Sequence, residues 1–404
     1  MNSLNVPKLR FPAFDGEWEE NELGNITNWA SGGTPPKDNP IFWDGDIPWI
    51  SASSMRGIVY SDSELKISSE GLKKGSKLAK KGSLLILVRG SMLFNKIPID
   101  IVLKDVSFNQ DVKSIVVDYN YSSSEFILNW FTAFEPKILH MVTGTGIGAG
   151  KLDLPDLKAL KISLPTLPEQ QKIASFLSAV DEKIQQLARR KELVEQYKKG
   201  VMQQLFSGKL RFKDENGNEY PDWEEKKLGE VAQIVTGKTP STSDATLWNG
   251  DVQFITPTDI KDGTKYQEKT ERYVANNDKI KILPINSIIY TCIASIGKMS
   301  ISKFPSITNQ QINSLVVNKD NNFEYIYYWL LHITPYIKTT QSNTTLPIIN
   351  KTDFSKFSIK IPSILEQQKI ANFLSGIDGK IEQVKGELVK TQEFKKGLLQ
   401  QLFV

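Results

Sequence analysis

The chain has 404 residues and a formal net charge of +4, and 40% of its residues are hydrophobic and 24% charged, which is ordinary for a soluble globular protein. No stretch reaches the roughly 18 apolar residues of a membrane span, and the first residues lack the apolar core of a secretory signal, so we expect a cytoplasmic protein. A single cysteine, Cys292, excludes internal disulfides, and with only two histidines a zinc cluster of soft ligands is excluded as well. A magnesium site built from carboxylates stays open, and the mildly basic charge permits nucleic-acid binding without establishing it.

The sequence of residues 1–164 predicts a globular region that contains both strands and helices. Short apolar runs at 83–88 and 114–117 are bounded by glycine, asparagine, aspartate and serine, which is the pattern of strands. The aromatic-rich stretch 123–134 predicts a short helix, and 161–165 alternates like a strand and ends at a proline.

Residues 165–206 predict one long helix. Pro168 and Glu169 suit its first turn, because proline is tolerated there and a carboxylate is stabilised by the helix dipole. Apolar residues then recur every seven positions over about five heptads, which is the signature of a coiled coil. One seam consists of Ile173, Val180, Leu187, Val194 and Val201, and the other of Leu177, Ile184, Lys191, Lys198 and Leu205.

The second half of the chain repeats the first. The segment 165–206 returns without a gap as 362–403, with identical residues at half of its positions. Anchors of the first globular region return in 207–361: Lys-Leu-Arg-Phe at 8 and 209, Gly-x-Thr-Pro at 32 and 237, Trp-x-Gly-Asp at 43 and 248, and Asn-Gln at 109 and 309. Strands are expected at 287–293, 314–317 and 358–362, and a short helix at 323–332. A repeat of this length predicts two copies of one structural unit, related by near symmetry, with a common framework and dissimilar loops.

The matching length and register of the two long helices favour their pairing as an antiparallel coiled coil. The alternative is that each helix packs on its own globular region. A helix of ~39 residues is about 58 Å long, which is on the order of 17 base pairs of B-DNA, so the pair fits the role of a spacer. The start of the chain supplies the tetrapeptide that follows the first helix, so we expect the two ends of the chain to meet.

Signatures of catalysis are weak. The glycine-rich stretch 144–150 matches the dinucleotide fingerprint, but Pro155 blocks the helix that the fingerprint requires, and the counterpart 339–347 contains no glycine. Asn-Pro-Ile-Phe at 39–42 resembles only part of an amino-methyltransferase element. We therefore expect no catalytic residues, no metal ligands and no cofactor bound by this chain.

Polar loops with small residues and isolated basic groups recur in both copies, which suits the reading of an extended polymer such as DNA. Arginine can pair bidentately with guanine, and asparagine or glutamine with adenine, while lysine and threonine suit phosphates. For any single residue, a solvated surface position is the alternative. The candidate DNA-binding residues of the first copy are Thr34, Ser51, Ser53, Arg56, Lys77, Arg89, Ser91, Lys96, Asn109, Gln110 and Thr145. Those of the second copy are Thr239, Thr256, Thr258, Lys261, Ser295, Lys298, Asn309, Gln310, Gln341 and Asn343.

Over its whole length the chain resembles the specificity subunit of type I restriction–modification systems. The resemblance rests on the Gly-x-Thr-Pro and Trp-(Asp/Asn)-Gly-Asp motifs, on the Asn-Gln pairs, and above all on the duplicated Leu/Ile-Pro-(x)3-Glu-Gln-Gln-Lys-Ile-Ala-x-Phe-Leu at 164–177 and 361–374. It implies an α+β fold with two pseudo-symmetric target recognition domains, separated by two long helices that form an antiparallel coiled coil. The implied boundaries are 1–164 and 207–361 for the domains and 165–206 and 362–404 for the helices.

The resemblance also implies a function and a set of partners. Each domain would read one half of a bipartite asymmetric site in double-stranded DNA, the helices would set the gap, and the chain would catalyse no reaction. Two modification subunits, docked on the exposed helix faces, would use S-adenosylmethionine to methylate adenine, and restriction or motor subunits would use ATP and Mg in a bacterial or archaeal cytoplasm.

Two other interpretations stay open. One is a coiled-coil adaptor that joins proteins and reads no DNA, and the other is a detached specificity subunit of a combined nuclease–methylase enzyme. Salt-sensitive binding to duplex DNA separates a DNA reader from the adaptor.

Overall fold

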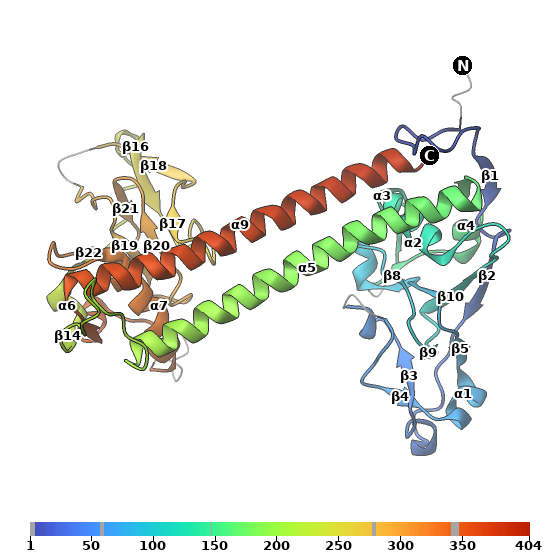
Figure 1. The fold of residues 1–404 in the computed structure, drawn as a ribbon, viewed down its shortest axis with the longest axis horizontal. Helices are drawn as coiled ribbons and strands as arrows, with labels where there is room; N and C mark the ends of the chain where they lie inside the picture. Colours follow the sequence, from blue (N-terminus) through green and yellow to red (C-terminus); the bar gives the residue numbers. More distant parts are fainter. Residues whose placement is uncertain (1–4, 57–59, 147, 277–279, 341–346) are drawn as a thin grey trace. The chain divides into compact units, whose positions relative to one another are not determined.

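The computed structural model describes residues 5–404 except 57–59, 147, 277–279 and 341–346. The chain forms two compact units: unit 1 consists of Met1–Ala188 and Gly386–Val404, and unit 2 of Arg189–Lys385. The boundaries fall inside two long helices, α5 (Leu167–Phe206) and α9 (Ile364–Leu402) (Figure 1). Each unit therefore contains the first part of one long helix and the last part of the other.

The described part of unit 1 is organised around short β-sheets. One four-stranded antiparallel sheet has the order β2 (Thr27–Ser31), β10 (Val112–Val117), β6 (Leu84–Leu87), β8 (Ile99–Ile101). A second has the order β4 (Lys66–Ile67), β3 (Ile47–Ile50), β9 (Val106–Phe108), β5 (Lys77–Ala79), with β3 and β9 parallel. The remaining strands are β11 (Thr143–Gly144), β12 (Gly150–Lys151) and β7 (Arg89–Gly90) in one small sheet, and β1 (Glu19–Glu22) paired with β13 (Lys161–Leu164).

Helices cover these sheets and complete the core of unit 1. They are α1 (Ser69–Gly75), α2 (Ser124–Ala133), α3 (Glu135–Leu139) and α4 (Leu154–Lys158), with the 3-10 turns η1 (Pro40–Phe42), η2 (Ser54–Arg56) and η3 (Ser91–Phe94). All four residues of β6 are buried, and they share a hydrophobic cluster with Phe126 and Trp130 of α2. Seam residues of the long helices join the same cluster, among them Ile173 of α5 and Leu402 of α9.

Unit 2 repeats this plan. In its described part a five-stranded sheet has the order β15 (Ala232–Thr236), β22 (Ile312–Val317), β19 (Ile288–Thr291), β20 (Met299–Ser302), β17 (Tyr266–Gln267). A smaller sheet has the order β18 (Arg272–Val274), β16 (Trp248–Ile255), β21 (Ser306–Thr308), and β14 (Glu224–Lys227) pairs with β23 (Ser358–Ile361). The helices are α6 (Leu228–Val231), η4 (Ala245–Leu247), α7 (Phe323–Thr339) and α8 (Lys351–Ser355).

The two units share their topology as well as their motifs. The antiparallel strands β2, β10 and β6 correspond to β15, β22 and β19, and the parallel pair β3–β9 corresponds to β16–β21. These correspondences confirm the predicted α+β architecture built from two pseudo-symmetric domains. The helix expected at 323–332 is longer than predicted, because α7 continues through Pro335 and keeps Ile337 buried against the domain core.

Within each unit the two long helices lie side by side. In unit 1 the Nζ of Lys395 on α9 contacts the Oδ1 of Asp181 on α5 at 2.6 Å, and in unit 2 the Nζ of Lys198 on α5 contacts the Oδ1 of Asp378 on α9 at 2.6 Å. The two ion pairs are equivalent in the repeat, since Asp378 corresponds to Asp181 and Lys395 to Lys198. Each pair joins the early part of one helix to the late part of the other. The helices are therefore antiparallel. Because their seams also belong to the domain cores, pairing and packing on the domains occur together.

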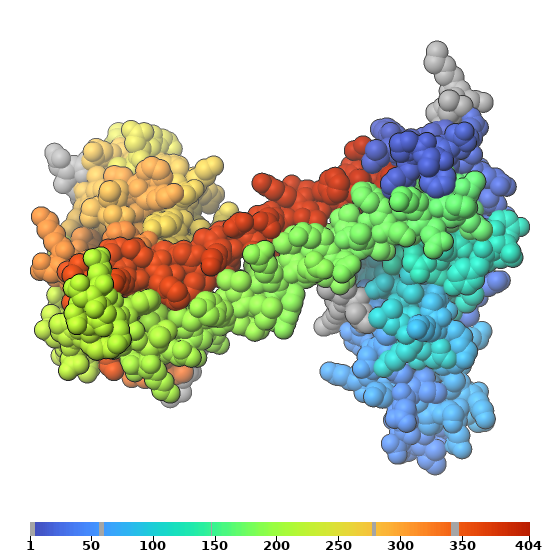
Figure 2. All heavy atoms as spheres, viewed as in Figure 1, coloured from blue at the N-terminus to red at the C-terminus, as the bar shows by residue number. Residues whose placement is uncertain are grey.

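The repeated Lys-Leu-Arg-Phe tetrapeptide joins a domain to the helices in both units. In unit 1 the backbone N–H of Leu9 donates to the carbonyl of Gln401 at 2.9 Å, and in unit 2 that of Leu210 donates to the carbonyl of Gln204 at 3.1 Å. The N-terminal segment lies beside the end of α9 and the first turns of α5 (Figure 2). The segment around Leu9 thus meets the end of α9, as the repeat predicts. No helix in the described ranges is long and apolar enough to cross a membrane.

Candidate nucleic-acid interface

The repeated Gly-x-Thr-Pro turn is a framework element. A Cβ built on Gly32 would lie 2.1 Å from the carbonyl oxygen of Phe108, and one built on Gly237 would lie 2.2 Å from the carbonyl oxygen of Asn309. Only glycine therefore fits where this turn packs on the Asn-Gln segment. The hydroxyl of Thr34 then donates to Oε1 of Gln110 at 2.8 Å.

The equivalent bond in unit 2 runs from the hydroxyl of Thr239 to Oε1 of Gln310 at 2.9 Å. Gln110 and Gln310 are themselves exposed, so each presents an amide at the surface from a fixed position. Four of the predicted residues are thus brought together in two equal pairs.

The asparagines of the Asn-Gln pairs bond to the residue two positions later, and Asn109 is buried while Asn309 is half-buried. Asn109 is 6% exposed, its Nδ2 donates to Asp111 at 3.2 Å, and its Oδ1 accepts from the backbone N–H of Asp111 at 3.1 Å. Asn309 makes the same two bonds with Gln311, at 3.0 and 3.1 Å. Their side chains close a turn, which gives them a framework role. Their contact with a base stays a prediction.

In each unit the predicted hydroxyls lie at the sheet edge that also carries the Asn-Gln segment, where the parallel strands β3 and β9, or β16 and β21, end. Ser51 and Ser53 follow β3 and lie with their oxygens 2.9 Å apart, and Thr256 and Thr258 follow β16 with their oxygens 2.8 Å apart. The backbone N–H of Asn109 donates to the carbonyl of Ile50, the last residue of β3. This bond places the hydroxyl loop next to the Asn-Gln segment, and Asn309 donates to Ile255 in the same way in unit 2. We call the edge formed by the hydroxyl loop and the exposed glutamine the reading edge of each unit.

Basic side chains flank the reading edge of unit 1. Lys77 on β5 is exposed and pairs in register with Phe108, one residue before Asn109. Lys113 on β10 donates to the carbonyl of Gln110 at 2.6 Å. Burial lowers the pKa of Lys113, and the nearby positive charge of Arg89 lowers it further while Asp111 opposes the change. A phosphate would relieve this repulsion between two cations.

Lys113 was missed by the sequence reasoning. It lies on a strand, and its nearness to Arg89 arises from the pairing of β10 with β6, which no local pattern reveals. Its repeat equivalent is Asn313, which is buried and donates to the carbonyl of Ile349 at 3.3 Å. The two reading edges therefore share a framework and differ in charge.

The remaining predicted residues lie in other loops, and among them Arg89 is close to Lys113. Arg89, Ser91 and Lys96 are exposed along β7 and the turn η3, and Thr145 lies in the β11–β12 hairpin, where its hydroxyl donates to the carbonyl of Ala149 at 2.8 Å. In unit 2, Lys261 is exposed, whereas Ser295 and Lys298 are half-buried in a turn tied to Thr291. Arg56 lies in η2, and Gln341 and Asn343 lie outside the described residues.

The repeated tryptophans also belong to the framework. The indole N–H of Trp43 donates to the carbonyl of Pro36 at 3.0 Å, and that of Trp248 donates to the carbonyl of Ser241 at 3.0 Å. Each indole thus closes the loop that follows the Gly-x-Thr-Pro turn. In unit 2 the guanidinium of Arg272 also lies over the Trp248 ring, 3.7 Å from its centroid, which places an exposed cation at this loop.

In unit 2, Cys292 is buried and His332 is half-buried. Burial raises the pKa of the Cys292 thiol to about 11, which suppresses its nucleophilic thiolate form. Burial also lowers the pKa of His332, whose ring lies 5.1 Å from that of Phe206. The two ends of the glycine-rich stretch pair as β11 and β12, and the five-residue helix α4 follows, which differs from the strand–loop–helix of a dinucleotide site. Among the described residues, no group of three or more His, Cys, Asp or Glu is arranged to hold a metal ion.

Comparison with known proteins gives consistent results. Residues 15–196 and 220–391 both match the family model described as type I restriction modification DNA specificity domain. The chain is 24% identical, over 98% of its length and 95% of the relative's, to the putative type I restriction enzyme MjaX specificity subunit of Methanocaldococcus jannaschii. Its fold is similar to that of the type I restriction–modification S subunit from M. genitalium, with a TM-score of 0.61, 18% identity, and 99% of each chain covered. It is also similar to a chain solved in a study of complex assembly and conformational transition of the type I R-M system, with a TM-score of 0.59, 17% identity, and 95% and 97% covered.

Proposed function

Because the chain belongs to the type I restriction modification DNA specificity family, and so is a DNA sequence-recognition subunit, we propose that each unit reads one half of a two-part DNA site. The observation that carries this proposal is the duplicated reading edge. In each unit a threonine–glutamine bond and a pair of hydroxyls follow parallel strands of the same topology. Amides, hydroxyls and cations fixed in this way suit contacts with base edges and phosphates.

Differences between the reading edges support an asymmetric site. Unit 1 offers Lys77, Lys113 and Arg89, while unit 2 has a buried Asn313 in place of Lys113. Equivalent frameworks with dissimilar exposed groups would place two unlike readers on half-sites in opposite orientation.

The paired helices fit the role of a spacer that sets the gap between the half-sites. Their exposed faces are also repeated, so they offer two equivalent docking surfaces for two copies of one partner. We assign these surfaces to two modification subunits, which would hold S-adenosylmethionine, and we assign ATP and Mg to restriction or motor subunits. In this scheme the chain directs chemistry that its partners perform.

The test is modified-base sequencing of genomic DNA from the host with and without the gene. The proposal expects methyladenine at one two-part motif to disappear on deletion, because the partners would lose their guide. An unchanged methylome in cells that express all subunits would contradict it and would favour the adaptor interpretation.

A domain exchange tests the division of labour between the units. Replacing residues 1–164 by another recognition domain of the family should change one half of the methylated motif and leave the other half and the gap unchanged. A change in both halves would refute independent reading by the two units.

A further inference from the structure

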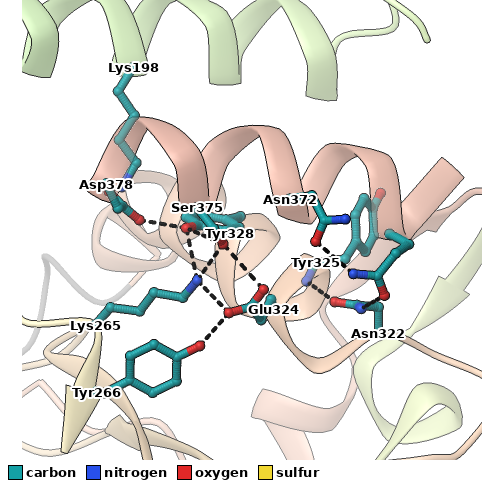
Figure 3. A network of polar contacts seen from close by, with 11 residues as sticks. Lys198, Lys265, Tyr266, Asn322, Glu324, Tyr325, Tyr328, Asn372, Ser375 and Asp378 are labelled. Atoms are coloured by element: carbon teal, nitrogen blue, oxygen red, sulfur yellow. Dashed lines mark hydrogen bonds and ion pairs between the residues drawn. The ribbon is translucent and has the colours of Figure 1, made fainter. Parts of the chain in front are cut away.

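A half-buried network of polar side chains joins the globular part of unit 2 to both long helices (Figure 3). Its centre is Lys265, which precedes the edge strand β17. The Nζ of Lys265 donates to Oε1 of Glu324 on α7 at 2.6 Å, to the hydroxyl of Ser375 on α9 at 2.6 Å, and to the hydroxyl of Tyr328 on α7 at 3.1 Å. An ammonium has three N–H donors, so all of them are used.

The network continues to the second long helix. The hydroxyl of Tyr328 donates to Oδ2 of Asp378 on α9 at 2.5 Å, and Oδ1 of Asp378 pairs with Nζ of Lys198 on α5 at 2.6 Å. The Tyr328 ring also lies 4.8 Å from Nζ of Lys265 and 5.1 Å from Nζ of Lys198. One edge strand, one domain helix and both long helices thus meet around a single buried tyrosine.

The pair at the centre of the network is well shielded from water. The side chains of Lys265 and Glu324 are 12% and 14% exposed, and the hydroxyl of Tyr266 also donates to Oε1 of Glu324. Burial opposes the ionisation of Glu324, but the bonds from Lys265 and Tyr266 outweigh it and hold the pKa of this carboxyl below its ordinary value. The ion pair is therefore formed at neutral pH.

In unit 1 the globular part contacts the long helices through different residues. Glu125, the repeat equivalent of Glu324, is exposed, and Asn129, the equivalent of Tyr328, donates to the carbonyl of Glu125 at 2.9 Å. The strand that faces the helices there is β8, and it carries Asp100. Burial raises the pKa of Asp100, and the negative charge of Asp181 on α5 raises it further although Lys395 on α9 opposes this. Unit 1 thus presents an acid to the helices from β8, whereas unit 2 presents Lys265 from the segment before β17.

We propose that Lys265 is a positioning residue that fixes the recognition domain of unit 2 on the helix pair and so determines which gap between the half-sites is accepted. This inference rests on the proposed function, because a gap has meaning only for a two-part site. Seam residues of both long helices, such as Leu205 and Leu374, pack in the core of unit 2 and hold the domain on the helix pair, but apolar contact is not directional. The hydrogen bonds from Lys265 and Tyr328 to Ser375 and Asp378 of α9 are directional and select one orientation of the domain. Without them the domain would shift on this apolar contact, and half-sites separated by one base pair more or fewer would become acceptable, since each base pair adds about 3.4 Å.

The experiment measures methylation by the complex assembled with its modification subunits. Synthetic duplexes carry the two natural half-sites separated by the natural gap or by one or two base pairs more or fewer, and initial rates of methyl transfer are compared. For Lys265→Met we expect the preference for the natural gap over its nearest neighbours to fall about tenfold, the effect of losing one hydrogen-bonded charge. The bases required in each half-site should stay the same.

Two matched controls and one further variant keep the result interpretable. Lys356→Met removes an exposed lysine of unit 2 that pairs with Asp353, and Glu125→Gln alters the repeat equivalent of Glu324, so both should retain the natural gap preference. Lys265→Met leaves Glu324 unpaired and can impair folding. The double variant Lys265→Met/Glu324→Gln removes both charges, so it should recover thermal stability and still accept altered gaps.

Each outcome decides the matter. A folded double variant with the natural gap preference would overturn the inference, as would a change in the bases read by unit 2, which would make Lys265 a DNA contact. If the wild-type complex itself shows no gap preference, the proposed function fails and the inference falls with it. A relaxed gap preference confined to the Lys265 variants would support the positioning role.

Discussion

Replacing Arg10 by methionine should destabilise unit 1 strongly, because it leaves a buried carboxylate without its partner. Arg10 holds Glu169 through two bonds, from Nε at 2.8 Å and from Nη2 at 2.7 Å, and the Glu169 side chain is 1% exposed. Removing one member of a buried ion pair costs about 4 kcal/mol. For domains of this size 1 kcal/mol shifts Tm by roughly 2–4 °C, so the expected loss is roughly 8–16 °C.

The repeat supplies a matched variant with a smaller expected effect. Arg211 holds Glu366 in the same way, at 3.2 and 2.8 Å, but Glu366 also accepts from the indole N–H of Trp223 at 3.0 Å. In unit 1 the equivalent indole, Trp18, has no partner for its N–H among the described residues. Arg211→Met should therefore cost less than Arg10→Met, by about 1.5 kcal/mol, the contribution of one hydrogen bond to a charged group.

Differential scanning calorimetry of the assembled complex and of the isolated chain would measure both variants. The double variant Arg10→Met/Glu169→Gln should recover more than half of the loss, since the buried charge is removed along with its partner. A Tm loss below 3 °C for Arg10→Met, or a larger loss for Arg211→Met, would refute the reasoning from buried charge.

Three further predictions concern packing, charge and DNA contact. Gly32→Ala and Gly237→Ala should each lower stability by about 3 kcal/mol or prevent folding, because the new methyl groups would lie 2.1 and 2.2 Å from backbone oxygens. Gly200→Ala lies inside α5 with open space around it, so it should instead raise the free energy of unfolding by about 0.5–1 kcal/mol, measured by chemical denaturation. Asp100→Asn should raise the Tm at pH 7, because burial and the nearby Asp181 disfavour the charged carboxylate. The pKa of Asp100 is raised in the folded chain, so the wild-type chain loses stability as the pH rises through that pKa. Tm values measured over a pH series should therefore show the difference between Asp100→Asn and wild type disappearing in acid, where the wild-type carboxyl is protonated. Lys113→Gln should reduce the slope of log K against log salt concentration for binding to duplex DNA by about 1. Lys80→Gln should leave this slope unchanged, because Lys80 follows the end of β5 opposite to Lys77 and forms an exposed ion pair with Asp105.

The long-range organisation of the chain was predictable from the sequence because it depends on periodicity. The heptads and the repeat placed the first long helix at 165–206, and α5 spans Leu167–Phe206. The strands at 114–117 and 314–317 fall inside β10 and β22. The compact units divide the helices at Ala188 and Lys385, since each helix end packs with the opposite end of the other helix, and this long-range packing has no local signal in the sequence.

The candidate interface was less predictable, because the same residue types serve two purposes. An Asn-Gln pair in a polar loop can hydrogen-bond to adenine or can close a turn. Only the structure shows that Asn109 is buried and that Gln110 is exposed. The Lys265 network was also invisible, since its members come from 198, 265, 324, 328, 375 and 378 and meet only through tertiary packing.

The internal repeat separates framework from readout within a single chain. Residues identical in both copies are the ones that hold the reading edge: Gly32 and Gly237 allow its close packing, and Thr34 and Thr239 bind its glutamines. If the two half-sites differ, residues that are the same in both units cannot distinguish them. Discrimination must then come from positions where the units differ, such as Lys113 against Asn313. Changing framework residues should therefore weaken recognition of a half-site without changing its bases, whereas changing the unlike residues should alter which bases are read.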